Sequence, residues 1–194
     1  MPGHRTTVVR ALVVAGALMA CGVPSAQATV IDQGTFRGSE LGVPDNICGI
    51  DVVRDSVFSG SFRIRAPRNG DGQAFLERFT LKATDTFTNP DNGQSFSFVT
   101  NETSNELSTS HVSGNVYEFT TIEAGQPFMI RDSDGNVVLR DRGNIRRTAV
   151  FDTLGDGQPG GIFLDETVVR VSGPHPAFFL TEDEFCGVIE GLIG

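Results

Sequence analysis

The chain has 194 residues, 39% hydrophobic and 20% charged, so it is long enough for one globular domain and too short for two ordinary ones. It carries 24 acidic and 15 basic residues, a formal net charge of −9, which disfavours non-specific binding to nucleic acids and anionic membranes. With 23 glycines, 15 phenylalanines and no tryptophan, its composition favours strands and turns, and therefore an all-β fold.

Residues 1–28 have the three parts of a secretory signal peptide. Two arginines make a positive start, an apolar run too short to span a membrane follows, and Ala26-Gln27-Ala28 offers the small residues that a signal peptidase reads. Cleavage after Ala28 is predicted, so the mature protein is expected to be secreted and extracellular. An alternative is a lipoprotein anchored through Cys21, because Leu18-Met19-Ala20-Cys21 resembles a lipobox. No later stretch reads as a transmembrane segment.

The mature part keeps two cysteines, Cys48 and Cys186, near opposite ends of the domain. In an oxidising compartment an even pair of cysteines predicts a disulfide bond. The two cysteines lack the C-x-x-C spacing of a metal site, so no metal is predicted there.

Residues 29–47 are predicted to be an extended N-terminal leader, and residues 48–194 a single β-rich domain. The clearest strand is Phe79–Phe87. In this strand apolar and polar residues alternate with a period of two, as expected when one face is buried and the other is exposed to solvent. The turn residues Asn89–Gly93 predict a hairpin to the next strand, Ser95–Thr100.

Further short apolar runs separated by turn residues predict seven more strands. Asp134-Gly135 is a strong hairpin signal, because both residues adopt positive φ at low cost. The runs are Val52–Phe58, Ser61–Arg65, Asn115–Ile122, Pro127–Arg131, Asn136–Leu139, Ile145–Thr153 and Ile162–Ser172.

Short connections predict an antiparallel meander that closes into a β-barrel, with a two-sheet β-sandwich as the alternative. One short C-terminal helix is predicted, because Thr181 and Glu184 form a capping box and apolar residues follow at helical spacing. The side chains expected in the core are Phe79, Leu81, Phe96, Phe98, Phe119, Val150 and Val169.

This layout resembles a group of small secreted proteins of Gram-positive soil bacteria. In that group a signal peptide is followed by a Cys-Gly pair that opens the first strand, a β-meander and a C-terminal cysteine; here these are Cys48-Gly49, the region Phe79–Phe98 with the Asp134-Gly135-Asn136 hairpin, and Cys186. The resemblance implies the disulfide and the β-architecture, and it brings no function to transfer.

The sequence predicts no catalytic residue and no cofactor-binding or metal-binding residue. A nucleophilic triad would have to use His111 or His175, the two mature histidines, and neither has a nucleophile and an orienting carboxylate beside it in sequence. His175, between two prolines, is interpreted as part of an exposed turn, and each histidine is expected to face solvent or to bind the backbone. Asp165-Glu166 fails as a glycosidase pair, because neighbouring residues of a strand point to opposite faces.

Two charged patterns have plain structural interpretations. Clustered oxygens that could bind calcium occur at Asp132–Asn136, Asn69–Asp71 and Asp152–Gly161, but they lack EF-hand spacing and suit ordinary turns. The basic segment 131–147 has interleaved aspartates, which favours a solvated face of mixed sign.

The sequence therefore favours a non-catalytic binding or structural module over an enzyme. Its partner is unknown; a small apolar ligand or another exported protein is expected, and nucleic acid is not. The alternative is a secreted hydrolase whose site is assembled only in three dimensions.

Overall fold

The computed structural model describes residues 29–66 and 73–194, and it confirms the all-β class with one short C-terminal helix. The predicted signal peptide, Cys21 and the turn Asn69–Asp71 lie outside the described residues. The elements are β1 (Val30–Ile47), β2 (Ile50–Arg65), β3 (Leu76–Thr88), β4 (Ser95–Ser113), β5 (Val116–Gln126), β6 (Met129–Arg131), β7 (Val137–Arg140), β8 (Gly143–Asp152), β9 (Ile162–Ser172), a 3-10 turn η1 (Ala177–Phe179) and α1 (Glu182–Ile193).

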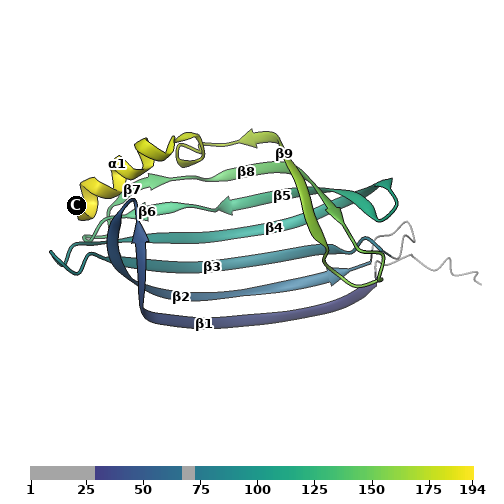
Figure 1. The fold of residues 1–194 in the computed structure, drawn as a ribbon, viewed down its shortest axis with the longest axis horizontal. Coiled ribbons are helices and arrows are strands. Elements are labelled where there is room, and N and C mark those ends of the chain that lie inside the picture. The colour runs from purple at the N-terminus through teal and green to yellow at the C-terminus, as the bar shows by residue number, and fades with distance from the viewer. Residues whose placement is uncertain (1–28, 67–72) are drawn as a thin grey trace, which may run out of the picture.

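The nine strands form one antiparallel sheet in the order β1-β2-β3-β4-β5-β8-β9, as the predicted meander requires. β4 is long enough to pair with β5 along one half and with β6 along the other, and β7 pairs with β6. In Figure 1 the helix lies at one end of the sheet, and the β8–β9 hairpin crosses the strands at the other end. Among the described strands, β1 and β9 are not paired with each other, so hydrogen bonds do not close the sheet into a barrel.

The segment 29–47 contributes a full strand rather than only a leader. β1 pairs with β2 along almost its entire length, from Val30 opposite Arg65 to Ile47 opposite Ile50. Cys48 and Gly49 form the two-residue turn between these strands, with φ of 54° and 81°. Positive φ at both positions is what a type I′ hairpin turn needs, so the Cys-Gly pair makes the turn instead of opening a strand.

Two predicted strand boundaries differ from the structure because polar residues also pair well in a sheet. Val52–Phe58 and Ser61–Arg65 are one strand, β2, which continues through Ser59 and Gly60. β4 runs on past Thr100 to Ser113, through a stretch of Asn, Glu, Thr and Ser that has no apolar alternation.

The period of two gives the sheet two chemically different faces. We call the face that carries α1 the apolar face, and the opposite one the polar face. On the apolar face, β1 and β2 alternate phenylalanine with glycine, so that Gly34 lies opposite Phe62, Phe36 opposite Gly60, and Gly38 opposite Phe58. Each ring contacts the glycine on the partner strand, at a place where a Cβ atom would collide with it.

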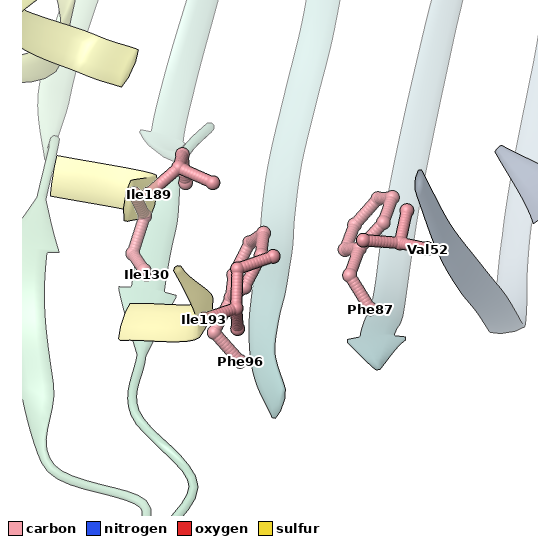
Figure 2. Close-up of a cluster of buried hydrophobic side chains, with 6 residues drawn as sticks. All are labelled: Val52, Phe87, Phe96, Ile130, Ile189 and Ile193. Carbon is pink, nitrogen blue, oxygen red and sulfur yellow. The ribbon is translucent and has the colours of Figure 1, made fainter. Parts of the chain in front are cut away.

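The main core lies where α1 packs on the apolar face. Ile189 of the helix is fully buried against the sheet, as the helical spacing predicts, and Ile193 is fully buried as well. Figure 2 shows these two side chains beside those that complete the cluster, Val52, Phe87, Phe96 and Ile130. Burial of such side chains stabilises the fold by about 1.5–3 kcal/mol each.

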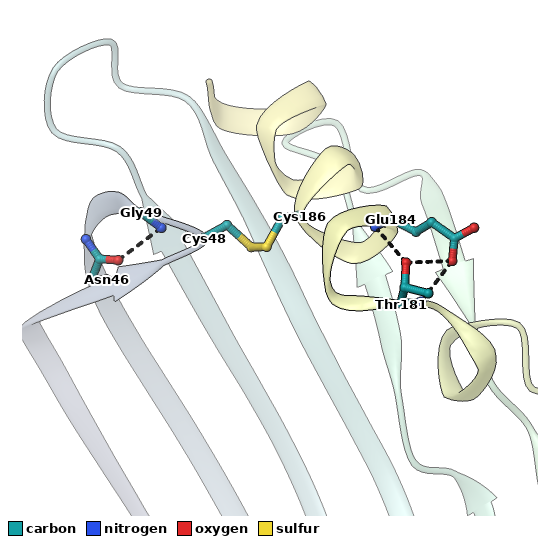
Figure 3. Close-up of a disulfide and its surroundings, with 6 residues drawn as sticks. All are labelled: Asn46, Cys48, Gly49, Thr181, Glu184 and Cys186. Atoms are coloured by element: carbon teal, nitrogen blue, oxygen red, sulfur yellow. Dashed lines mark hydrogen bonds between the residues drawn. A yellow bond between two sulfur atoms is a disulfide. The ribbon is translucent and has the colours of Figure 1, made fainter.

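Covalent and polar contacts hold α1 in place. The predicted Cys48–Cys186 disulfide is present and joins the β1–β2 turn to the helix (Figure 3). The predicted capping box is present too: the Glu184 amide donates to Thr181 Oγ1 at 3.3 Å, and the Thr181 amide donates to Glu184 Oε2 at 2.8 Å. At the other helix end, the side-chain amide of buried Asn89 donates to the Ile193 carbonyl at 2.8 Å.

The expected core is confirmed in part. Phe96 and Phe119 are buried, and Phe79, Leu81, Phe98 and Val150 are partly buried. Val169 was predicted to be buried, and this is wrong, because it is 54% exposed. The register between β8 and β9 shifts there, so that Arg146 pairs with Arg170 and Arg147 with Val168, and Val169 is left unpaired in a bulge on an edge strand.

We predict that the double variant Cys48→Ala/Cys186→Ala is folded but less stable by as much as about 5 kcal/mol, because the bond closes a loop across 138 positions. Urea unfolding of the oxidised protein and the variant would measure the loss. Equal midpoints would show that the helix stays docked without the bond.

A second prediction concerns the glycine pattern. Alanine at Gly60 would place its Cβ against the Thr80 carbonyl and the Phe36 ring, whereas at Gly34 the nearest atom, 2.7 Å away, belongs to the Phe62 ring, which can rotate. Gly60→Ala should therefore cost about 2 kcal/mol or more, and Gly34→Ala less than about 1 kcal/mol. Thermal unfolding of both variants tests this order, and equal losses would contradict it.

Candidate functional site

The centre of the apolar face carries a group of partly exposed apolar side chains. We call this group the phenylalanine floor: Phe36 from β1, Phe58 and Phe62 from β2, and Phe79 and Leu81 from β3. The rings of Phe36 and Phe79 are stacked, with centroids 5.5 Å apart, and those of Phe36 and Phe58 are tilted at 6.4 Å. The floor is thus a continuous aromatic surface that remains accessible.

The floor lies between two covers on the same face. At one end α1 packs over Val52, Phe87 and Phe96. At the other end the loop between β8 and β9 brings Pro159 and Gly160 beside residues of β2, β3, β4 and β5. The two covers leave the central part of the apolar face as the open stretch between them.

A cavity of about 290 Å³ lies beneath the β8–β9 loop, where the floor ends. It continues the floor, because Ile64 follows Phe62 on the apolar face of β2 and Glu77 precedes Phe79 on that of β3, while Phe75 lies just before β3. The lining is mostly apolar, with two carboxyl groups: Ile64, Phe75, Glu77, Glu106, Phe119, Phe151, Pro159 and Gly160. Such a mixture of apolar walls with a few polar groups is typical of small-molecule sites.

Glu106 is the residue of the cavity whose pKa is shifted most clearly. Burial raises the pKa of Glu106 to about 7, and the charge of Glu77 adds to this, while the hydrogen bond from the Glu77 amide to Glu106 Oε2, 2.6 Å long, opposes it. Near neutral pH this carboxyl can therefore donate a hydrogen bond when protonated or present a negative charge when ionised.

A second polar cluster lies on the same face across β4, β5, β8 and β9. Arg147 forms ion pairs with Glu123, at 3.3 Å, and with Glu166, and its guanidinium lies over the Phe178 ring. Burial raises the pKa of Glu102, the negative charge of Glu123 raises it further, and Arg147 opposes both. Because Arg147 is paired on both sides, this cluster ties neighbouring strands together.

The two histidines contact backbone carbonyl groups. His111 is exposed, and its Nε2 lies 2.9 Å from the Gly114 carbonyl across the β4–β5 turn. The exposed turn predicted for His175 is wrong, because this residue is 3% exposed and its ring lies against Gly143; it contacts the backbone, which was the other expected placement. Its Nε2 is 3.2 Å from the Ser172 carbonyl, and its Nδ1 is 3.9 Å from Asp141 Oδ2.

Asp141, beside His175, holds the backbone of the segment that follows β9. It is buried, and its carboxylate accepts hydrogen bonds from the backbone amides of Ala177 and Phe178 at 2.8 and 3.0 Å. These contacts fix the chain where it leaves β9 and turns toward α1. The region therefore has a structural task that the sequence did not indicate.

The aspartate clusters serve turns. The Asp132 carboxylate accepts hydrogen bonds from the amides of Asp134 and Asn136 and from the Asn136 side chain, and that side-chain bond is the main reason why the pKa of Asp132 lies below its usual value. Asp152 and Asp156 accept bonds from amides two residues further on. Across residues 29–66 and 73–194, no three His, Cys, Asp or Glu side chains gather as metal ligands.

The structure separates residues that are adjacent in the charged segments. Asp165 pairs with Val150 and Glu166 with Ala149, so the two carboxyl groups point to opposite faces, as the strand period predicts. The same holds in the basic segment 131–147, where Arg146 and Arg147 belong to opposite faces of β8.

Sequence reasoning missed Glu106 and the cavity. The alternation in Phe79–Phe87 did indicate one apolar face, but the polar run after Thr100 was not recognised as the continuation of β4. Glu106 therefore could not be placed beside Phe119 and Phe151, which come from later strands. No family model, curated protein or solved structure matches the chain.

We predict that Glu106 makes stability depend on pH. Its ordinary pKa is 4.5, so between pH 4.5 and about 7 the folded state binds more protons there, and its contribution to stability is lost as the pH rises through this window. Glu106→Gln removes the titration and keeps an acceptor for the Glu77 amide. Above pH 8 the variant should be more stable than the native protein by on the order of 2–3 kcal/mol.

Urea unfolding of both proteins from pH 4 to pH 9 would measure this difference. A gap between the two proteins that is the same at both ends of the range would show that Glu106 titrates like an exposed carboxyl.

Proposed function

We propose that the protein is a secreted, non-catalytic binding module that holds a small apolar ligand on its phenylalanine floor. The observation that carries the proposal is the accessible aromatic surface between α1 and the β8–β9 loop. Packed cores hide such side chains, and exposed contiguous apolar surface commonly marks an interaction site. No second layer of structure covers this part of the sheet. A ligand on the floor would bury the apolar side chains that are left accessible there.

The adjoining cavity supports a small molecule rather than a flat partner. Its volume of about 290 Å³ suits one end of a ligand, while the rest lies along the floor toward Phe36 and Phe58. Glu106 would then meet a polar group of the ligand, because it lies at the far end of the floor.

One structural feature supports export. The Cys48–Cys186 disulfide persists best in an oxidising compartment, in keeping with the predicted signal peptide. No helix among the described residues is long and apolar enough to cross a membrane.

The hydrolase alternative has less support. A nucleophilic mechanism needs a base that is open to substrate, and buried His175 faces the Ser172 carbonyl and Asp141 instead. His111 is exposed, but its Nε2 lies on the Gly114 carbonyl. Binding therefore accounts for the accessible floor and the cavity better than catalysis does.

The test is titration of the mature, oxidised protein with N-phenyl-1-naphthylamine, a neutral apolar dye that fluoresces when it leaves water. We expect saturable binding that Leu81→Lys weakens at least tenfold, because Leu81 shares a row with Gly60 and Phe36 at the centre of the floor.

The matched control is Val57→Lys, which places the same charge on the polar face, where Val57 is 59% exposed. It should leave dye binding unchanged. Circular dichroism of both variants confirms folding, and either the absence of saturable binding or equal weakening by the two variants would overturn the proposal.

A further inference from the structure

One row of directly paired residues crosses the polar face through all seven strands of the main order. From β1 to β9 each member pairs with the next, and four of the seven are arginines. We call this set the arginine row: Gln33, Arg63, Arg78, Asn105, Ile122, Arg146 and Arg170.

The row contains two pairs of like charges in direct opposition, Arg63 with Arg78 and Arg146 with Arg170. Like charges at such positions destabilise a sheet. All four side chains are exposed, and within the described residues none of them forms an ion pair. Arg147, next to Arg146 but on the apolar face, has two carboxylate partners, so the fold does pair arginines elsewhere.

The neighbouring rows add cations and hydroxyl groups but no acid. The next row on this face, two residues further along each strand, is neutral. It consists of Thr35, Ser61, Thr80, Thr103, Ala124, Asn144 and Ser172. The row after it has two more cations and consists of Arg37, Ser59, Lys82, Asn101 and Gln126. These three described rows therefore hold six cationic side chains and no carboxylate, although the whole chain has a net charge of −9.

The same surface is grooved. Three adjoining depressions of about 540, 730 and 800 Å³ run over β1–β4, lined by Arg63 and Arg78, by Thr80 and Lys82, and by Arg37 and Asn101. Six inter-strand spacings of about 4.8 Å give the arginine row a length of about 29 Å, which suits a chain of several residues rather than one small anion.

We propose that the polar face binds a linear acidic polysaccharide across the strands. Carboxylate or sulfate groups on the polymer would meet the paired arginines, and sugar hydroxyl groups would meet the Thr, Ser and Asn side chains between the two cationic rows. A nucleic acid fits less well, because the three rows have no aromatic ring for base stacking, and the rings of β1–β3 lie on the opposite face.

The experiment measures binding of the mature, oxidised protein to heparin, a sulfated probe, and to polygalacturonate, a carboxylated one, by calorimetry over a salt series. We expect the protein to bind at least one of the two and not neutral dextran. Heparin alone would assign sulfate as the recognised group, and polygalacturonate alone would assign carboxylate.

The variant Arg63→Gln/Arg78→Gln should weaken binding at least tenfold and reduce the dependence on salt, because fewer counterions are released. The matched pair is Arg146→Gln, which should weaken binding, and Arg147→Gln, which removes the same charge from the other face and should not. Circular dichroism establishes that each variant is folded, so loss of binding cannot come from unfolding.

Three results would overturn the proposal: no binding of either acidic polymer at 50 mM salt, unchanged binding by the Arg63→Gln/Arg78→Gln variant, or equally tight binding of oligothymidylate. The last result would show a surface that attracts any polyanion. The dye titration uses the opposite face, so the two proposals can fail independently.

Discussion

The constraint on which the structure depends is the two-residue period of its strands. In a long antiparallel meander, directly paired residues share a face, so a pattern within one strand becomes a row across the whole sheet. Phe36, Gly60 and Leu81 form such a row on one side, and the arginine row forms another on the opposite side. Both proposed binding surfaces therefore arise from the same backbone register.

A single sheet has to protect its apolar face, and this protein covers only the ends. The helix, the disulfide and the buried asparagine at the β3–β4 turn secure one end, and the β8–β9 loop lies over the other. In the centre, rings lie over glycines on the partner strand, which reduces their exposure without a second layer. That solution leaves an aromatic surface accessible, which a fully packed sandwich would not do.

Charge is distributed by face as well. On the apolar face Arg147 is balanced by Glu123 and Glu166, as expected where ionic groups are partly removed from water. No cation is among the described residues that line the cavity of Glu106, and burial raises its pKa to about 7. On the polar face, cations stand side by side in water, where repulsion is weak enough to tolerate and where an anionic ligand would relieve it.

The sequence was informative wherever the signal is local. The capping box of Thr181 and Glu184, the Asp134-Gly135 hairpin, the alternation in Phe79–Phe87 and the pairing of two lone cysteines depend on neighbouring residues or on simple counting, and the structure has all of them. The strand in residues 30–47 was harder to recognise, because glycines that usually indicate loops serve here as the partners of phenylalanine rings.

What depends on register could be decided only by the tertiary structure. Arg63, Arg78, Arg146 and Arg170 are far apart along the chain, and no local pattern shows that pairing places them in one row. The same is true of Glu106, whose cavity is lined by residues from five other parts of the chain, and of Val169, which lies unpaired in a bulge. A shift of one residue in any strand would move each of these side chains to the other face, because the period is two, so their placement follows from the pairing of the whole sheet rather than from any single segment.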